Sequence, residues 1–528
     1  MKYTEATVCQ VSDLQDGQMK EVKVGETDVL IAKSDGEFFA THAKCTHYQA
    51  PLATGILHNG RITCPWHNAC FDLRSGHRLE APALNALPAY AVRIEGANVL
   101  VRVPDTADDA VLNPMVKADN AGNAETYVVV GGGGAAAFAA EALRQGGFAG
   151  RIVLISAETD LPYDRPNCSK DYLQGEAPDE WMPLRDENFY RDYGIELRKG
   201  QAVASLNATT KAIELANGEV LSYDKALICT GGKPRRLDVP GTDLDGVRYL
   251  RTLTDSQQLR NMVTNEPDRP GKRVVIVGSS FIGLEGAMSL RKLGCEVDVV
   301  GKETVPFEKI WGARIGRVIQ GWHEAAGIRF HLGRKTERLE GNGTVEAVVL
   351  DNGERLAADL VLIGLGVTPS TDFVREVPLE EDGGIKTDAF LNVADGLYAA
   401  GDIAHYPSPD GPVRIEHWKV AGQQGHVAGL NMAGRAQAYD VVPFFWSNQQ
   451  GKRLNYIGHA TRIDDIVYDG SPEADESFLA FYVQDGEIKA ATGLKRDADM
   501  AIIQQLMREK RMPSVEIVRK GVRWAELL

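Results

Sequence analysis

The order of apolar and polar positions divides the chain into three stretches. In the first stretch, short apolar or alternating runs are separated by Gly, Asn and Asp, and the runs at 29–33, 61–64 and 99–103 predict strands of a small all-β domain. Residues 105–125 are rich in Asp, Asn, Ala and Gly without apolar periodicity, which predicts an extended, flexible linker. The third stretch alternates apolar strands with helical patterns, which indicates an α/β fold.

The α/β stretch begins with a βαβ unit. Its expected elements are a strand at 127–130, a glycine loop at 131–134, a helix to about residue 144 and a second strand at 151–156. Gly131, Gly133 and Ala136 fit the G-x-G-x-x-[G/A] fingerprint, and Gly134 lies in the same loop. Glycine permits a tight turn and the close approach of a pyrophosphate, whose charge the helix N-terminus meets. Glu158 follows the second strand and is placed to hold ribose hydroxyls, so the unit predicts a dinucleotide site.

A second unit repeats this order further along the chain. Its expected elements are a strand at 273–277, a loop at 278–283, a helix to about residue 293 and a strand at 296–300. Gly278, Ser280 and Gly283 follow the fingerprint, with Ser280 in place of the middle glycine. Glu303 is the candidate ribose acid and disfavours a 2′-phosphate, whereas Lys302 beside it favours one. We therefore expect a second dinucleotide, NADH, with NADPH as the alternative.

Two pairs of Cys and His lie in the predicted β domain. Cys45 and His47 are followed, after residues 48–63, by Cys64 and His67. These ligand types hold a Rieske [2Fe-2S] centre, where one iron takes two thiolates and the other two imidazoles. A Cys2His2 zinc site is the alternative, but zinc fingers usually pair Cys with Cys and His with His, whereas each pair here mixes the two. In this pattern the first hundred or so residues resemble the Rieske family.

From about residue 125 onward the chain resembles the FAD-dependent ferredoxin reductases of oxygenase systems, which also resemble apoptosis-inducing factor. The motifs that carry the resemblance are P-Y-D-R-P-N-C-S-K at 162–170, C-T-G-G at 229–232, A-A-G-D at 399–402, E-H-W at 416–418 and P-F-F-W-S at 443–447. The resemblance implies that Arg165 and Lys170 contact FAD and that Lys170 pairs with Glu285 near the flavin ring. It further implies flavin contacts from a set of residues in the later motifs: Thr230, Gly231, Asp402, Glu416, His417 and Trp418.

Together these patterns predict a multidomain protein. Its fold class is an all-β Rieske domain, then an α/β flavoprotein reductase with two dinucleotide-binding domains, then a C-terminal α+β interface domain. The expected boundaries are 1–104 for the Rieske domain, 105–125 for the linker, 126–255 and 388–440 for a discontinuous FAD domain, 256–387 for the NAD(P)H domain and 441–528 for the C-terminal domain.

Composition narrows the partners. The net charge of −15 argues against nucleic acid and against an anionic membrane surface. The N-terminus lacks the features of a signal peptide, and no apolar run reaches the roughly 18 residues of a membrane span. We expect a soluble cytoplasmic protein with no nucleic acid and no membrane partner, and a homodimer is compatible with the sequence.

The resemblance implies an electron-transfer enzyme that passes electrons from NADH to FAD, then to its own cluster, then to an external acceptor protein. An oxygenase component, a cytochrome P450 or a ferredoxin fits that role. Lys170, Glu285 and Trp418 are the predicted catalytic residues, with Trp418 between flavin and cluster. His47 and His67 are expected to lie near solvent, where electrons leave the cluster. The linker is expected to let the cluster swing towards a partner.

Two alternatives remain open at this point. Cys168 lies where thiol-dependent NADH peroxidases, NADH oxidases and coenzyme A disulfide reductases carry a reactive cysteine, although an apolar filler suits the same position. The C-x4-C pair of the superfamily's dithiol reductases is absent from the first helix. The other alternative is a redox-sensing signalling protein of the apoptosis-inducing-factor type.

Overall fold

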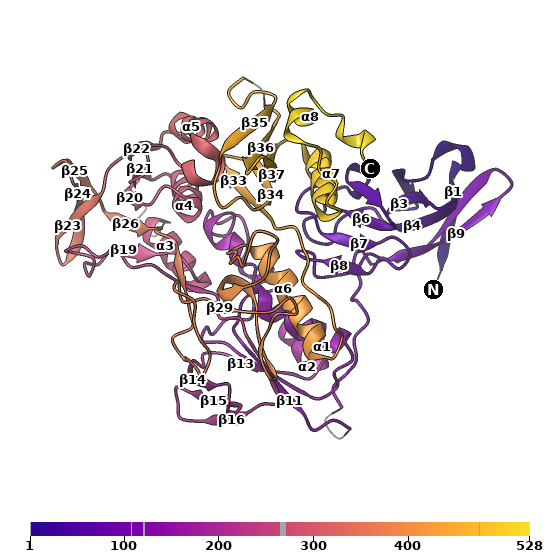
Figure 1. The fold of residues 1–528 in the computed structure, drawn as a ribbon, viewed down its shortest axis with the longest axis horizontal. Helices are drawn as coiled ribbons and strands as arrows, with labels where there is room; N and C mark the ends of the chain where they lie inside the picture. The colour runs from indigo at the N-terminus through magenta and orange to yellow at the C-terminus, as the bar shows by residue number, and fades with distance from the viewer. Residues whose placement is uncertain (1, 107, 120–121, 265–270, 475) are drawn as a thin grey trace.

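A computed structural model describes residues 2–106, 108–119, 122–264, 271–474 and 476–528 (Figure 1). Its N-terminal part consists of antiparallel sheets, as the alternating pattern predicts. The larger sheet has the order β1-β10-β9-β4-β3-β2, formed by β1 (Tyr3–Gln10), β2 (Met19–Val24), β3 (Thr27–Ser34), β4 (Glu37–His42), β9 (Ala89–Glu95) and β10 (Asn98–Pro104). The smaller sheet runs β5 (Ile56–His58), β6 (Arg61–Thr63), β7 (Cys70–Asp72) and β8 (Arg78–Glu80). The two Cys/His pairs lie in the loops that follow β4 and β6.

The linker is extended but packed. Its described residues form an isolated bridge between Ala86 and Val111, and no helix or regular strand. Asn113 hydrogen-bonds both backbone groups of Arg78 in the Rieske part, and the Val116 amide donates to the Arg144 carbonyl in the α/β part. The described residues of the linker therefore bond to both of its neighbours. Backbone hydrogen bonds hold the Rieske part in a docked arrangement here, and the expected swing of the cluster towards a partner stays a prediction.

The first α/β sheet unites two distant stretches of the chain. Its order is β13 (Ile195–Arg198), β12 (Arg151–Ile155), β11 (Thr126–Val130), β17 (Lys225–Ile228), β31 (Leu397–Ala399) and β30 (Asn392–Ala394). The strands pair in parallel except for β30 with β31. Helices α1 (Gly134–Gln145) and α6 (Trp418–Met432) pack closely on each other, and α2 (Glu187–Asp192) lies beside β13. This sharing of one sheet supports the discontinuous domain predicted from the sequence.

Short strands extend this part of the molecule. One small sheet contains β16 (Val220–Ser222), β15 (Ala212–Leu215), β14 (Val203–Asn207) and β28 (Val374–Arg375). Two-stranded pairs join β18 (Gly232–Pro234) to β27 (Val367–Pro369), and β29 (Ile385–Lys386) to β32 (Ala404–His405).

The second α/β unit forms a parallel sheet with the order β19 (Val247–Tyr249), β26 (Leu360–Ile363), β20 (Arg273–Val277), β21 (Glu296–Gly301) and β22 (Arg329–Leu332). Its helices are α3 (Leu253–Thr264), α4 (Phe281–Lys292) and α5 (Glu308–Ala325). A three-stranded sheet of β23 (Thr336–Asn342), β24 (Thr344–Leu350) and β25 (Arg355–Ala357) flanks it. The predicted strand and helix positions of both βαβ units agree with these bounds to within two residues.

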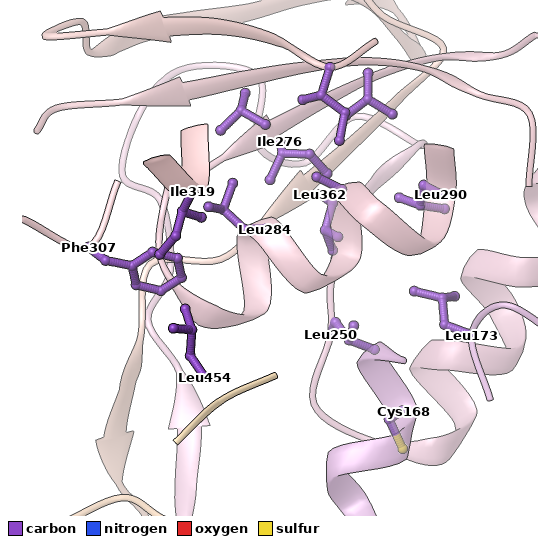
Figure 2. Close-up of a cluster of buried hydrophobic side chains, with 14 of the residues drawn as sticks. Cys168, Leu173, Leu250, Ile276, Leu284, Leu290, Phe307, Ile319, Leu362 and Leu454 are labelled. Atoms are coloured by element: carbon purple, nitrogen blue, oxygen red, sulfur yellow. The ribbon is translucent and has the colours of Figure 1, made fainter. Parts of the chain in front are cut away.

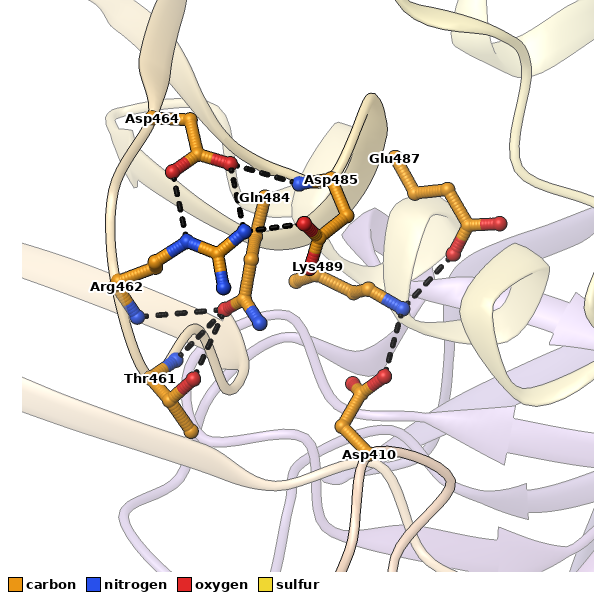
Figure 3. Close-up of polar contacts among 8 residues, drawn as sticks. All are labelled: Asp410, Thr461, Arg462, Asp464, Gln484, Asp485, Glu487 and Lys489. Atoms are coloured by element: carbon orange, nitrogen blue, oxygen red, sulfur yellow. Dashed lines mark hydrogen bonds and ion pairs between the residues drawn. The ribbon is translucent and has the colours of Figure 1, made fainter.

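The C-terminal part is the expected α+β unit. Its antiparallel sheet runs β33 (Phe444–Gln449), β34 (Lys452–Gly458), β37 (Glu487–Leu494), β36 (Phe478–Gln484) and β35 (Asp465–Asp469), followed by α7 (Asp497–Arg508) and α8 (Val515–Arg519). Figure 3 shows that Gln484 Oε1 accepts hydrogen bonds from the amide and hydroxyl of Thr461. Lys489 Nζ lies 2.9 Å from Asp410 Oδ1, which ties β37 to the loop after β32.

One hydrophobic core joins the second α/β unit to the C-terminal sheet (Figure 2). Ile276 of β20, Leu284 of α4 and Leu362 of β26 pack in it together with Leu454 of β34. The same core reaches Cys168 in the 3₁₀ turn Arg165–Ser169, so the loop beside the first dinucleotide unit is fixed by packing.

Candidate functional site

The four predicted cluster ligands come together at the tips of two loops. His47 Nδ1 and His67 Nδ1 lie 3.2 Å apart, and the buried thiols of Cys45 and Cys64 lie within hydrogen-bonding reach of each other. Burial lowers the pKa of His47 to about 3 and places the pKa of His67 well below its ordinary value. Both imidazoles are therefore neutral, which is the form that binds metals.

This arrangement fits two irons better than one zinc ion. In the described ranges of the chain, no three His, Cys, Asp or Glu side chains converge as a single metal ion requires. A [2Fe-2S] cluster needs only a pair of thiolates on one iron and a pair of imidazoles on the other. The facing thiol pair and imidazole pair meet that requirement.

A cavity of about 490 Å³ lies where the two α/β units and the C-terminal sheet meet. A second cavity, of about 510 Å³, shares Gly133, Arg165, Gly231 and Arg251 with the first. The predicted residues that line the first cavity are Gly133, Gly134, Arg165, Lys170, Gly231, Ser280, Glu285, Asp402, Glu416, His417 and Trp418. Glu158 and Thr230 line the second. Because the two cavities share these lining residues, they adjoin and form one site.

The fingerprint glycines lie behind the cavity walls, where space is tight. Gly131 has a φ of +144°, and a Cβ there would lie 2.3 Å from the Cys229 carbonyl oxygen. A Cβ at Gly283 would lie 2.0 Å from the carbonyl oxygen of Gly278. Side chains at these positions would push the loops away from the neighbouring strands, so glycine keeps the helix N-termini within reach of a pyrophosphate. Ala136, Gly278 and Gly283 line neither cavity, and neither does Glu303, whose ribose role stays a prediction.

Lys170 and Glu285 form the pair that the resemblance implies. Lys170 Nζ lies 2.7 Å from Glu285 Oε2, and the side chain of Glu285 is only 5% exposed. The hydroxyls of Ser169 and Ser447 donate to the same carboxylate, each at 2.7 Å. Glu285 thus links both α/β units to the C-terminal sheet, and its hydrogen bonds make this buried charge tolerable.

A second set of charged side chains lies where the two cavities adjoin. Arg165 forms an ion pair of 2.6 Å with Glu158 and donates to the Arg251 carbonyl. Arg251 reaches Asp402 at 3.5 Å and was not anticipated from the sequence. No motif contains Arg251, so only the fold brings it beside the predicted flavin residues.

The cavity also contains a buried ring nitrogen without a hydrogen-bond partner among the described residues. His417 lines it, and His417 Nδ1 is buried with no hydrogen-bond partner among the described residues. Burial lowers the pKa of His417 to about 3, so the ring is neutral and able to donate or accept. An unpaired buried polar atom at this place fits a polar ligand such as flavin.

Trp446 is the aromatic residue that lies between the cavity and the cluster ligands. Its ring lines the cavity and lies 4.3 Å from the His67 ring and 6.2 Å from the His47 ring, centroid to centroid. Trp418 also lines the cavity but packs against Gly134 at the start of α1. Of the two, Trp446 is the one whose ring contacts a predicted cluster ligand, and the role of Trp418 between flavin and cluster stays a prediction.

The ligand histidines face inward, which corrects the expectation that both lie at a solvent exit. His67 is 5% exposed and is covered by Trp446. His47 is half-buried, and the ring of Tyr48 stacks on it. The Rieske part presents this edge to the reductase because it is docked there.

The docking surface is built around Glu80 of β8. Its carboxylate accepts from Arg508 of α7 at 2.7 Å, from Gln423 of α6 at 3.0 Å and from Arg61 at 2.5 Å. Lys419 of α6 is fully buried, lies 3.8 Å from Glu80 and donates to the Asn68 carbonyl at 2.6 Å. These contacts join the Rieske part to both the FAD part and the C-terminal part.

The thiol alternative finds no support at Cys168. The side chain is 3% exposed, packs in the core of Figure 2 and lines neither cavity. Burial raises the pKa of the thiol to about 12, so it is protonated at neutral pH. Reactive cysteines instead have lowered pKa values and access to solvent. The apolar-filler interpretation therefore holds for this structure.

Family models match three consecutive parts of the chain. The model of pyridine nucleotide-disulphide oxidoreductases matches residues 125–425, more than half of the chain. The chain belongs to this family. In this pyridine nucleotide-disulphide oxidoreductase, residues 4–91 match the Rieske [2Fe-2S] domain and residues 444–520 match the reductase C-terminal domain.

Known relatives share this organisation in whole or in part. The oxidoreductase is 34% identical to apoptosis-inducing factor 3 of Homo sapiens over 95% of this chain and 84% of that protein. It is 31% identical to the ferredoxin–NAD+ reductase component of the biphenyl dioxygenase system of Paraburkholderia xenovorans, over 72% of this chain and 93% of that one. Putidaredoxin reductase, solved in a covalent complex with putidaredoxin, matches with a TM-score of 0.71 and 28% identity, over 76% of this chain and 98% of that one.

These findings establish a ferredoxin-reductase-type NAD(P)H flavoprotein with a Rieske [2Fe-2S] domain. The predicted fold class and the cofactors FAD, NAD(P)H and a [2Fe-2S] cluster are confirmed. None of the helices formed by the described residues combines the length and apolar character that crossing a membrane requires.

Proposed function

We propose that the protein takes electrons from NADH through FAD to its own Rieske cluster and delivers them singly to an external acceptor protein. The observation that carries the proposal is Trp446, whose ring touches both the cavity and His67. FAD, when bound, accepts a hydride from the nicotinamide and releases its electrons one at a time, and a [2Fe-2S] cluster carries one electron.

Residues of the chain prepare the cavity for this reaction. Lys170 holds a positive charge at the cavity wall, and Glu285 fixes its position through the 2.7 Å ion pair. Asp402 and His417 offer an acceptor and an unpaired ring nitrogen to the same space. Trp446 closes the side that faces His67, and the ring of Phe445 covers His417 at 4.3 Å between centroids.

The docked Rieske part makes the internal transfer a step within one molecule. Glu80, Lys419 and Arg508 hold it against α6 and α7, and the linker is bonded on both sides. The cluster ligands therefore stay next to Trp446 and need no diffusional encounter. In the solved relative the partner putidaredoxin is a separate protein, whereas here the first carrier belongs to the same chain.

The external acceptor is proposed to be an oxygenase component, a cytochrome P450 or a further ferredoxin. The relative from the biphenyl dioxygenase system supports the first of these. The alignment with apoptosis-inducing factor 3 over 95% of this chain supports a second candidate, a redox-sensing signalling protein. Slow turnover combined with redox-dependent binding of a partner would favour that second function.

A test of the internal path replaces Trp446 in the full holoprotein. Under anaerobic conditions, NADH is mixed with the protein and bleaching of the flavin and of the cluster is followed separately. Trp446→Ala should leave flavin reduction near the parent rate and slow cluster reduction at least tenfold, whereas Trp446→Phe should slow it less because a ring is kept. Trp181→Ala, which removes a side chain that is 70% exposed, is the control. Equal cluster reduction in Trp446→Ala and the parent would contradict the proposed path.

A further inference from the structure

The two ligand imidazoles have different nearest aromatic rings, although Tyr48 also lies 5.6 Å from the His67 ring and Trp446 lies 6.2 Å from the His47 ring, centroid to centroid. His67 is 5% exposed, and its nearest ring is that of Trp446, on the side of the cavity. His47 has the ring of Tyr48 stacked on it at 4.0 Å between centroids and 26° between planes. Tyr48 is 43% exposed, so its ring connects a buried ligand to the surface.

The ring of Tyr48 is held by the reductase rather than by its own domain. Its hydroxyl donates to Asp164 Oδ2 at 2.5 Å and accepts a hydrogen bond from Asn167 Nδ2 at 3.5 Å. Asp164 is fixed in turn, because its amide donates to the Met182 carbonyl at 2.9 Å. The stacking geometry therefore depends on the docked arrangement of the two parts.

We propose that Tyr48 is the outlet through which electrons leave the His47 side of the site for the external acceptor. This inference rests on the proposed function, since it needs a cluster that is reduced from within the chain. An aromatic ring in van der Waals contact with a ligand offers a short path to the surface, whereas the path through His67 ends at Trp446 and the cavity. The partner is a protein that accepts one electron and places its redox centre against the exposed edge of Tyr48.

The step is balanced without any change of bonds. One electron leaves the site and one acceptor molecule is reduced by one electron. Tyr48 keeps its proton, because its hydroxyl remains hydrogen-bonded to Asp164, and the ring is neither oxidised nor reduced overall. Tyr48 therefore acts as a positioning residue and conducting contact.

The test separates the two half-reactions in the full holoprotein. Tyr48→Leu removes the ring, Tyr48→Phe keeps the ring and loses the hydroxyl, and Trp181→Ala is a matched surface control. Each protein is reduced with NADH in one experiment and with dithionite in another, then mixed with oxidised cytochrome c as the one-electron probe. Electron paramagnetic resonance of the reduced cluster reports whether His47 remains in place.

We expect Tyr48→Leu to slow cytochrome c reduction at least tenfold while the resonance spectrum and NADH-driven cluster reduction match the parent. Tyr48→Phe should retain most of the parent rate. Undiminished cytochrome c reduction in Tyr48→Leu overturns the inference, as does a changed resonance spectrum that accompanies equal slowing of both half-reactions. Failure of NADH to reduce the cluster in the parent refutes the proposed function instead, and the dithionite experiment still tests Tyr48.

Discussion

Replacing Glu80 by Gln should release the Rieske part from the reductase. The substitution keeps the shape of the side chain but removes the charge that Arg61, Lys419 and Arg508 share. Burial by itself raises the pKa of Glu80, but these three cations outweigh it and hold that pKa below its usual value. The carboxylate is therefore ionised in the docked state, and its loss leaves buried cations without a counter-charge.

The size of the effect can be worked out in two ways. Removing one partner of a buried ion pair costs about 3–5 kcal/mol. The cost of deprotonating Lys419 gives a second estimate of similar size. Burial lowers its pKa from 10.5 to about 8 even with Glu80 present, and releasing its proton at pH 7 costs about 5 kcal/mol relative to the ordinary pKa of 10.5. The open population of the interface should thus rise between about a hundredfold and a few thousandfold.

Hydrogen–deuterium exchange of the holoprotein measures this opening. Peptides that cover residues 66–80 and helix α7 should exchange faster in Glu80→Gln by that factor, while peptides from the sheet of β20 keep the parent rate. Glu37→Gln is the matched control in the same domain, because Glu37 and its partner Arg74 are both 62% exposed, and it should stay within about 0.5 kcal/mol of the parent. Parent-like exchange in Glu80→Gln, or an equal effect of Glu37→Gln, would refute the role of Glu80 in docking.

Three further substitutions test the site. Cys168→Ser should leave NADH oxidation unchanged in a steady-state assay, and the parent thiol should resist iodoacetamide up to pH 9, because burial raises its pKa to about 12 and it stays protonated below that value. Rapid alkylation of Cys168 in the folded protein would contradict this. Glu285→Gln should raise the midpoint potential of the flavin, by an equivalent of about 1.5–3 kcal/mol, because the charge of Lys170 is no longer balanced; an unchanged potential in a spectroelectrochemical titration would speak against the pair. Glu303→Gln should weaken the preference for NADH over NADPH in kcat/KM, and an unaltered ratio would remove Glu303 from the nucleotide site.

The helices and strands of the two βαβ units could be predicted because each depends mainly on residues that are close together in the sequence. The strand Arg273–Val277 and the helices that follow both glycine loops were found from apolar periodicity and turn chemistry. The pairing of Lys170 with Glu285 was also expected, but only because the resemblance to the ferredoxin reductases implies it.

The contacts between domains could not be predicted from such local patterns. Glu80 and Lys419 are far apart in the sequence. The residues around each of them do not distinguish it from an ordinary solvent-exposed charge. Their burial results from the docking of a β domain on helix α6, which no local signal encodes. The same applies to Trp446, which was noted as part of a motif but whose neighbour His67 lies in another domain. The packing of the predicted linker likewise depends on surfaces that only the assembled fold creates.

The central claim, that the chain reduces its own cluster from NADH, is tested most directly by one measurement. Anaerobic stopped-flow spectroscopy with excess NADH, repeated over a hundredfold range of protein concentration, follows bleaching of the Rieske absorbance. A docked cluster beside Trp446 predicts a first-order rate that does not change with protein concentration. A rate that rises in proportion to protein concentration, or a cluster that stays oxidised while the flavin is reduced, would contradict the account.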